Sequence, residues 1–301
     1  MDNTTTFTPG SNWDFDFNST NKENNIVDFA REKMSQASLT TDPWDYLYVE
    51  NFLPEEFYNK FDKETMSLLN HDKIQNNARR RVCIYDTRNS DKDVSMETNT
   101  RKNWLNKDWP STRRTDTAEN AMPYSHKFCK IFEDKVFRDI LLAKFKNSGR
   151  CGDRPQPKIT GTYATYDVQT PPFKYKVHGE AGQKILSILV YLATKGDDES
   201  LGTRIYPGHT VPDRLDFDKD CVKIIPYRPN SIFLFSRTND IWHDSDGVKH
   251  RKISNHAMQN NSTKTRLRRS IQLFYMEDLS AEERSKIYNT GGVITPSAAH
   301  S

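Results

Sequence analysis

The chain has 301 residues, of which 44 are basic and 41 acidic, giving a formal net charge of +3. This near-balance provides no overall attraction to nucleic acid or to a membrane surface, so we expect neither as a partner. No run of about 18 apolar residues occurs, and the first residues lack the features of a signal peptide. The four cysteines are scattered without a Cys-x-x-Cys pair, which favours reduced thiols in a cytoplasmic protein.

The two ends of the chain are expected to lie outside the folded domain. Residues 1–25 are rich in Asn, Thr, Ser and Asp and lack apolar periodicity, a composition typical of disorder. Apolar residues recur at helical spacing over 26–38, which predicts a short amphipathic helix. We therefore expect a disordered or loosely docked tail at 1–41, a folded domain at 42–280, and a C-terminal tail at 281–301.

Strand and helix signals alternate in the first half of this domain. Residues 45–51 resemble an entry strand, and Pro54 with the two glutamates after it marks a helix start. Residues 86–121 are mostly polar and charged, which predicts a long irregular segment of the kind that often forms a lid or binding loop. Apolar residues recur every three or four positions over 124–146, which predicts one or two helices.

From about residue 156 the apolar pattern changes from helical to extended. Short strands separated by Gly, Pro, Asp and Asn favour a sandwich or a jelly-roll barrel, and with the preceding helices they predict an α+β fold. The expected strands are 158–167, 173–178, 184–193, 203–206, 221–225, 231–236 and 266–276.

A histidine and a carboxylate two residues apart, His178 and Glu180, begin the candidate site. In an extended segment their side chains point to the same face, so the imidazole and the carboxylate converge. His243, in the sequence Ile-Trp-His-Asp-Ser, offers a third ligand. Two histidines and one carboxylate leave open positions on a metal, the arrangement used for non-haem Fe(II) oxygen chemistry. We expect these three residues to hold iron.

Two later pairs of polar residues fit a pocket beside this iron. Ser187 and Tyr191 share one face of a strand that is otherwise apolar on both faces, so they would add polar atoms to an apolar cavity. Arg268 and Ser270 share one face of the last expected strand. A guanidinium with a neighbouring hydroxyl is suited to binding a carboxylate through two parallel hydrogen bonds.

The order of these motifs resembles that of the Fe(II)/2-oxoglutarate-dependent dioxygenases, and in particular their prolyl-hydroxylase-like branch. The histidine–carboxylate pair, the distal histidine and the Arg-x-Ser pair occur in the family's order, supported by the strands at 184–192 and 229–235. The resemblance covers roughly 42–278. It implies a double-stranded β-helix, a jelly-roll or cupin-like barrel with its core at about 156–276 and supporting helices N-terminal to it.

The resemblance also implies roles for individual residues. His178, Glu180 and His243 would be the catalytic iron ligands, although the family's usual acid is aspartate. Arg268 would bind the distal carboxylate of 2-oxoglutarate, helped by neighbouring hydroxyls. The implied co-substrate contacts are Arg268, Ser270, Tyr191, Ser187 and, at the other end of the co-substrate, Tyr166.

The implied activity is hydroxylation of an unactivated C–H bond. Fe(II) would be the metal, 2-oxoglutarate and O₂ the co-substrates, ascorbate a supporting reductant, and succinate and CO₂ the by-products. The branch favours a prolyl, peptidyl or other protein substrate. A small-molecule substrate, such as an amino acid, sugar or nucleotide, is the alternative within the family, and a non-catalytic metal-binding cupin-like module is the alternative outside it. The oligomeric state is left open.

Overall fold

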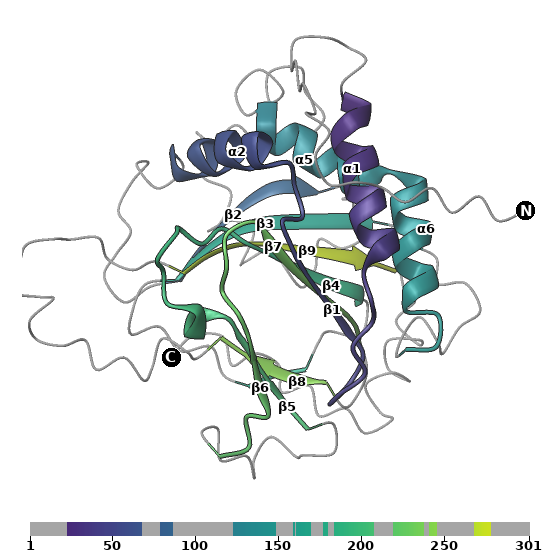
Figure 1. The fold of residues 1–301 in the computed structure, drawn as a ribbon, viewed down its shortest axis with the longest axis vertical. Coiled ribbons are helices and arrows are strands. Elements are labelled where there is room, and N and C mark those ends of the chain that lie inside the picture. The colour runs from purple at the N-terminus through teal and green to yellow at the C-terminus, as the bar shows by residue number, and fades with distance from the viewer. Residues whose placement is uncertain are drawn as a thin grey trace, which may run out of the picture.

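The computed structural model contains two antiparallel sheets, with helices on the outer face of the larger one (Figure 1). Helices together with antiparallel sheets confirm the α+β prediction. No helix in the described part of the chain is long and apolar enough to cross a membrane. The structure describes residues 23–67, 79–86, 123–148, 159, 161–169, 177–179, 184–207, 219–237, 241–245 and 268–277.

The larger sheet has six strands in the order β1-β7-β4-β9-β3-β2, and the smaller has three in the order β6-β5-β8. Every pairing within them is antiparallel. The strands of the larger sheet are β1 (Tyr46–Glu50), β2 (Arg79–Asp86), β3 (Gly161–Gln169), β4 (Lys184–Tyr191), β7 (Ser231–Ser236) and β9 (Arg268–Met276). Those of the smaller sheet are β5 (Thr203–Tyr206), β6 (Lys223–Ile225) and β8 (Trp242–Asp244), and a short 3-10 helix, η1 (Glu199–Leu201), precedes β5.

The central strands of the larger sheet bury both of their faces, but with different chemistry. In β9, Ile271, Leu273 and Tyr275 share one face and belong to the core that the helices cover. Arg268, Ser270 and Gln272 occupy the other face and are also buried. Figure 1 shows the smaller sheet on this second side. The fold therefore encloses polar side chains between its two sheets.

Within the described residues, four helices cover the apolar face of the larger sheet (Figure 1). Aromatic rings join them, since Phe61 of α2 stacks on Phe128 of α5 with ring centroids 4.6 Å apart. Phe132 of α5 meets Phe137 of α6 edge-on at 5.4 Å. The helices are α1 (Glu23–Gln36), α2 (Glu55–Ser67), α5 (Pro123–Glu133) and α6 (Lys135–Lys144).

The helix expected at 26–38 is observed as α1, which lies within the segment expected to be a tail. Its residues Ile26, Ala30 and Met34 are four positions apart and buried, so they form one apolar face against the other helices. The remainder of the expected tails, 1–22 and 281–301, lies outside the described residues. The domain bounds stay a prediction, and α1 belongs to the packed helical layer.

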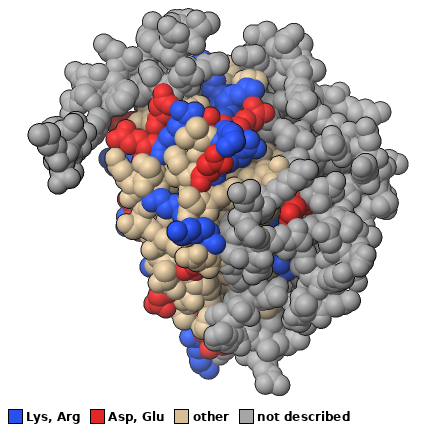
Figure 2. Space-filling view, turned by 90° about the vertical axis from the view of Figure 1, so that its right-hand side faces the viewer, with Lys and Arg blue, Asp and Glu red and all other residues tan. Residues whose placement is uncertain are grey.

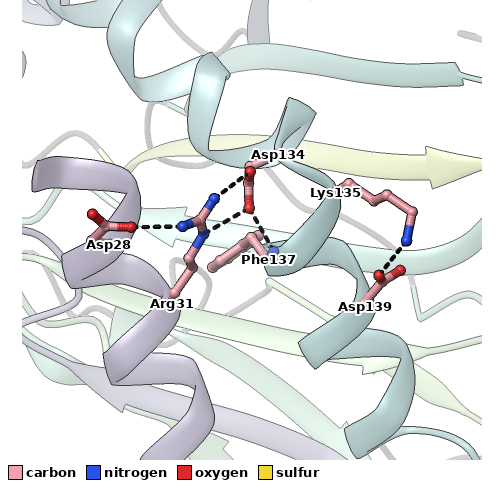
Figure 3. A network of polar contacts seen from close by, with 6 residues as sticks. All are labelled: Asp28, Arg31, Asp134, Lys135, Phe137 and Asp139. Atoms are coloured by element: carbon pink, nitrogen blue, oxygen red, sulfur yellow. Dashed lines mark hydrogen bonds and ion pairs between the residues drawn. The ribbon is translucent and has the colours of Figure 1, made fainter. Parts of the chain in front are cut away.

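A fork-shaped ion pair joins α1 to the start of α6 (Figure 3). Arg31 donates from Nε to one carboxylate oxygen of Asp134 at 2.9 Å and from Nη2 to the other at 2.6 Å. Asp134 is also the N-cap of α6, because it accepts a hydrogen bond from the backbone N–H of Phe137 at 2.7 Å. The hydrogen bond from Arg31 lowers the pKa of the Asp134 carboxyl below its ordinary value.

Asp134→Asn is expected to lower the free energy of unfolding by about 1 kcal/mol near neutral pH, because the amide keeps the cap but loses the ion pair. A carboxyl whose pKa is depressed in the folded state adds stability above its unfolded pKa and loses it as pH falls through the folded value. The difference in stability between the two proteins should therefore shrink as pH falls through the depressed pKa of Asp134. Urea unfolding near neutral pH and in acid measures this, and an unchanged difference in acid would contradict it.

Charges of both signs mix on the face of the molecule shown in Figure 2. Ion pairs between helical neighbours occur in α5, where Lys130 pairs with Glu133, and in α6, where Lys135 pairs with Asp139. Such exposed pairs contribute at most about 1 kcal/mol each. The described part of this face shows no broad area of a single sign.

Candidate metal and co-substrate site

The structure places the two predicted histidine ligands side by side. His178 and His243 form an isolated antiparallel bridge, in which each backbone N–H donates to the other residue's carbonyl oxygen at 3.1 and 3.3 Å. Their ring centroids lie 4.4 Å apart, with the ring planes at 49°. Since residues paired across an antiparallel bridge present their side chains on the same face, the two imidazoles converge.

The surroundings of the pair are largely apolar. His243 is buried, and its ring meets that of Phe235 of β7 at 4.8 Å in an edge-on arrangement. His178 is half-buried. The Phe235 ring therefore forms one apolar wall beside the His243 imidazole.

The predicted third ligand, Glu180, lies outside the described residues, one position beyond Gly179. Within the residues that are described, no group of three or more His, Cys, Asp or Glu side chains could hold a metal. The two adjacent imidazoles fit one ion held by both, and they are the nitrogen donors that non-haem iron uses. The role of Glu180 as carboxylate ligand stays a prediction.

Arg268 is a buried cation at the start of β9. Its side chain is 1% exposed. Nε donates to the backbone carbonyl oxygen of Leu201 at 2.7 Å, and Nη2 lies 3.5 Å from the hydroxyl of Thr203. Nη1 has no hydrogen-bond partner among the described residues, and no described carboxylate pairs with the guanidinium. A buried charge without a partner is costly, so this environment favours an anionic ligand.

Hydroxyl groups surround this guanidinium. Tyr191 of β4 lies under it, with Cζ of Arg268 5.6 Å from the ring centroid, and the Tyr191 hydroxyl shares a 2.6 Å hydrogen bond with Thr203. Burial raises the pKa of Tyr191, so its phenol stays neutral and can donate a hydrogen bond. Ser270 is the cross-strand partner of Tyr191, and its hydroxyl has no partner among the described residues.

Ser187 lies further along the same face of β4. Its cross-strand neighbours are Phe235 on β7 and Phe274 on β9, and its buried hydroxyl has no partner in the described part of the chain. Phe235 is also the ring that contacts His243. Ser187 therefore belongs to the side of the enclosed space near the histidines, whereas Arg268 marks the other side.

Tyr166 is the predicted site residue that the structure does not bring together with the others. It pairs with Ile271 across β3 and β9, and both side chains belong to the core covered by the helices. Successive side chains of a strand alternate between faces, so the polar face of β3 carries the neighbours of Tyr166 instead. Thr165, Asp167 and Gln169 occupy that face and are all buried.

Gln169 is a site residue that the sequence interpretation missed. It is the cross-strand partner of Arg268, and its side-chain oxygen accepts a 3.1 Å hydrogen bond from Ser245, two residues after His243. Gln169 thus joins the arginine end of the site to the histidine end. The signal in the sequence was the alternation of polar residues at Thr165, Asp167 and Gln169, which begins in the expected strand 158–167 and continues two residues beyond it.

Gly202 allows the turn that brings the Leu201 carbonyl to Arg268. A Cβ at this position would overlap the backbone carbonyl of Ile225 on β6. Gly202→Ala should therefore separate β5 from β6 and lower the free energy of unfolding by about 1–3 kcal/mol, as overpacking does. Thermal unfolding measures this, with Gly179→Ala as a contrast where the nearest atoms to the added Cβ lie at 3.6 Å, an ordinary van der Waals contact. Equal stability of Gly202→Ala and the unmodified chain would contradict the close approach.

No family model and no curated protein matches the chain. Several solved structures, however, do match the chain. A prolyl hydroxylase from Trichoplax adhaerens, in complex with a hypoxia inducible factor peptide fragment, has a TM-score of 0.44 and 12% identity, covering 88% of this chain and 94% of that one. A Pseudomonas putida prolyl-4-hydroxylase has a TM-score of 0.41 and 9% identity, covering 84% and 92%. A non-haem α-ketoglutarate-dependent epimerase of nogalamycin biosynthesis has a TM-score of 0.39 and 10% identity, covering 83% of each chain.

The scores and identities are low, so the proposal below rests on the chain's own residues.

Proposed function

We propose that the chain is an Fe(II)- and 2-oxoglutarate-dependent dioxygenase that hydroxylates an unactivated C–H bond. One observation carries the proposal: a buried arginine without a carboxylate partner and a pair of adjacent histidines both lie between the two sheets, where Arg268 approaches Thr203 of β5 and His243 contacts Phe235 of β7. Gln169 connects them, as the neighbour of Arg268 on one side and the partner of Ser245, close to His243, on the other. The two sheets that enclose this space would be the halves of a double-stranded β-helix.

Each residue has a defined task in this proposal. His178, His243 and Glu180 would hold Fe(II) and leave positions on the metal open. Arg268 would bind the distal carboxylate of 2-oxoglutarate through its free Nη1, with Ser270 donating a second hydrogen bond. When bound, Fe(II) together with 2-oxoglutarate and O₂ supplies the oxidation that inserts one oxygen atom into a C–H bond and releases succinate and CO₂.

The protein's own contribution is orientation and exclusion of water. The carbonyl of Leu201 fixes the guanidinium through Nε and leaves Nη1 without a partner among the described residues. The neutral phenol of Tyr191 lies below it. With Arg268 1% exposed, the attraction between guanidinium and carboxylate acts in a low-dielectric site and is stronger than it would be in water.

The substrate proposed is a prolyl, peptidyl or other protein residue, supported by the prolyl-hydroxylase-like motifs of the sequence. A small molecule of the same reaction class is the alternative. The segment expected to form a lid or binding loop, 86–121, lies almost wholly outside the described residues. Fold and cofactor do not by themselves determine the substrate.

The test is formation of succinate from 2-oxoglutarate by the purified full-length chain. We expect slow succinate formation that needs both Fe(II) and 2-oxoglutarate, and faster formation with the correct member of a panel of proline-containing peptides and free amino acids. Mass spectrometry of the accelerating peptide should show one added oxygen. Absence of any 2-oxoglutarate turnover with Fe(II), ascorbate and O₂ present would contradict the proposed activity.

A further inference from the structure

The strand that carries His243 is very short. β8 spans only Trp242–Asp244, and its described neighbours are β5 on one edge and the bridge to His178 on the other. His243 lies opposite Ile205 of β5. Because side chains alternate along a strand, a slip of one residue between β8 and β5 would turn His243 away from the enclosed space. So short a ladder needs a further interaction to specify its register.

A buried ion pair supplies that interaction at the next residue. Arg204 of β5 donates from Nε and Nη2 to the two carboxylate oxygens of Asp244, at 2.8 and 2.7 Å. Tyr206 donates its hydroxyl to the same carboxylate at 2.9 Å. The side chains of Arg204 and Asp244 are 5% and 2% exposed. A two-bond fork has one favourable alignment, which pairs Asp244 with Arg204 and therefore His243 with Ile205.

The network lies on the opposite face of the small sheet from the proposed site. Along β5, Arg204 and Tyr206 alternate with Thr203 and Ile205, and along β8 Asp244 follows His243. The side chains of the network therefore lie on the face of the small sheet opposite to that of the His243 side chain. Trp242 and Tyr206 pack there with Val177, the residue before His178. This face thus contacts the segments that carry both histidines.

We propose that Arg204, Tyr206 and Asp244 are positioning residues for the metal site: their buried network sets the register of β8 and so holds His243 beside His178. The proposal rests on the proposed function, because it assigns a role toward the same metal. It adds a determinant of metal affinity that binds neither metal nor co-substrate.

The test compares Asp244→Asn with a matched variant elsewhere in the fold. Asp134→Asn makes the same chemical change in a two-bond arginine–aspartate fork, between α1 and α6 and away from the site (Figure 3). The metal-free variants are first compared by melting temperature. Co(II) is then titrated into each, well below its melting temperature, and followed by its visible ligand-field absorption. We expect about 10-fold weaker Co(II) binding and an altered absorption in Asp244→Asn, as for other supports of metal ligands, and unchanged binding in Asp134→Asn.

Tyr206→Phe provides a milder variant if Asp244→Asn does not fold, since it removes one hydrogen bond and leaves the fork intact. A measurable loss of Co(II) affinity in Tyr206→Phe supports the proposal. The comparison uses whichever of Asp244→Asn and Tyr206→Phe folds. If that variant has the same Co(II) affinity and absorption as Asp134→Asn, the positioning role is overturned and the proposed function still stands. Failure of the unmodified chain to bind Co(II), or binding that His178→Ala does not weaken, would overturn both.

Discussion

Replacing Arg268 with alanine is expected to weaken 2-oxoglutarate binding by about 30-fold or more while iron stays bound. Removing one partner of a charge pair shielded from water costs roughly 2–5 kcal/mol, of which 2 kcal/mol corresponds to about 30-fold. Arg268 is 1% exposed, and its Nη1 has no partner among the described residues, so water does not replace the lost interaction easily. Calorimetric titration of 2-oxoglutarate into the Fe(II) protein without oxygen measures the change.

Arg269→Ala is the matched control for this variant. It removes the adjacent arginine of β9, whose side chain points to the helices and pairs with Asp62 of α2 at 2.6 Å. This variant should lose stability but keep its affinity for 2-oxoglutarate. Arg268→Lys, which retains the charge without the planar fork, should fall between wild type and Arg268→Ala. Equal affinity in wild type and Arg268→Ala would rule out Arg268 as the anchor.

His178→Ala and His243→Ala are each expected to lower Fe(II) affinity by at least about 100-fold. The basis is that loss of an outer-shell support already costs 10–100-fold, and a direct ligand contributes more. The rings are 4.4 Å apart and joined by the backbone bridge, so either imidazole alone leaves the ion with half of its nitrogen donors. Metal content after gel filtration of the Fe(II)-loaded protein provides the measurement.

His126→Ala serves as the control for both histidine variants. His126 lies on α5 in the helical layer, so its loss removes a histidine without approaching the bridge. Iron content of this variant should equal that of wild type. Retention of iron by both His178→Ala and His243→Ala would mean that the metal binds elsewhere or not at all.

The strands that the sequence predicted well are those with a strong apolar pattern. The expected 203–206 and 231–236 match β5 and β7, and the expected 184–193 contains β4. Two strands were not predicted. β2 begins with three arginines, which gave no strand signal, and it forms a strand by pairing with β3. β8 has only three residues, too few for any periodicity, and depends on β5 for its strand conformation.

The structure brings some of the predicted site residues together, and the pleat of the strands explains why one of them lies apart. The type and order of His178, His243 and Arg268 were sufficient to expect two imidazoles and an arginine in one space, and the structure places the two rings together. Tyr166 was chosen by its position in the chain, but a shift of one residue along a strand reverses the face, and its side chain packs under the helices. Gln169 was not predicted, because it is relevant to the site only as the cross-strand partner of Arg268, and no local sequence pattern reveals that pairing.

The most direct measurement of the central claim is the visible absorption that 2-oxoglutarate produces when it binds to the Fe(II) protein without oxygen. Such a metal-to-ligand band requires both groups to meet in one site. We predict that it appears in the wild-type protein, is absent from His243→Ala, and needs about 30-fold or more 2-oxoglutarate to saturate in Arg268→Ala. A wild-type protein that takes up Fe(II) and 2-oxoglutarate and develops no such band would contradict the shared site.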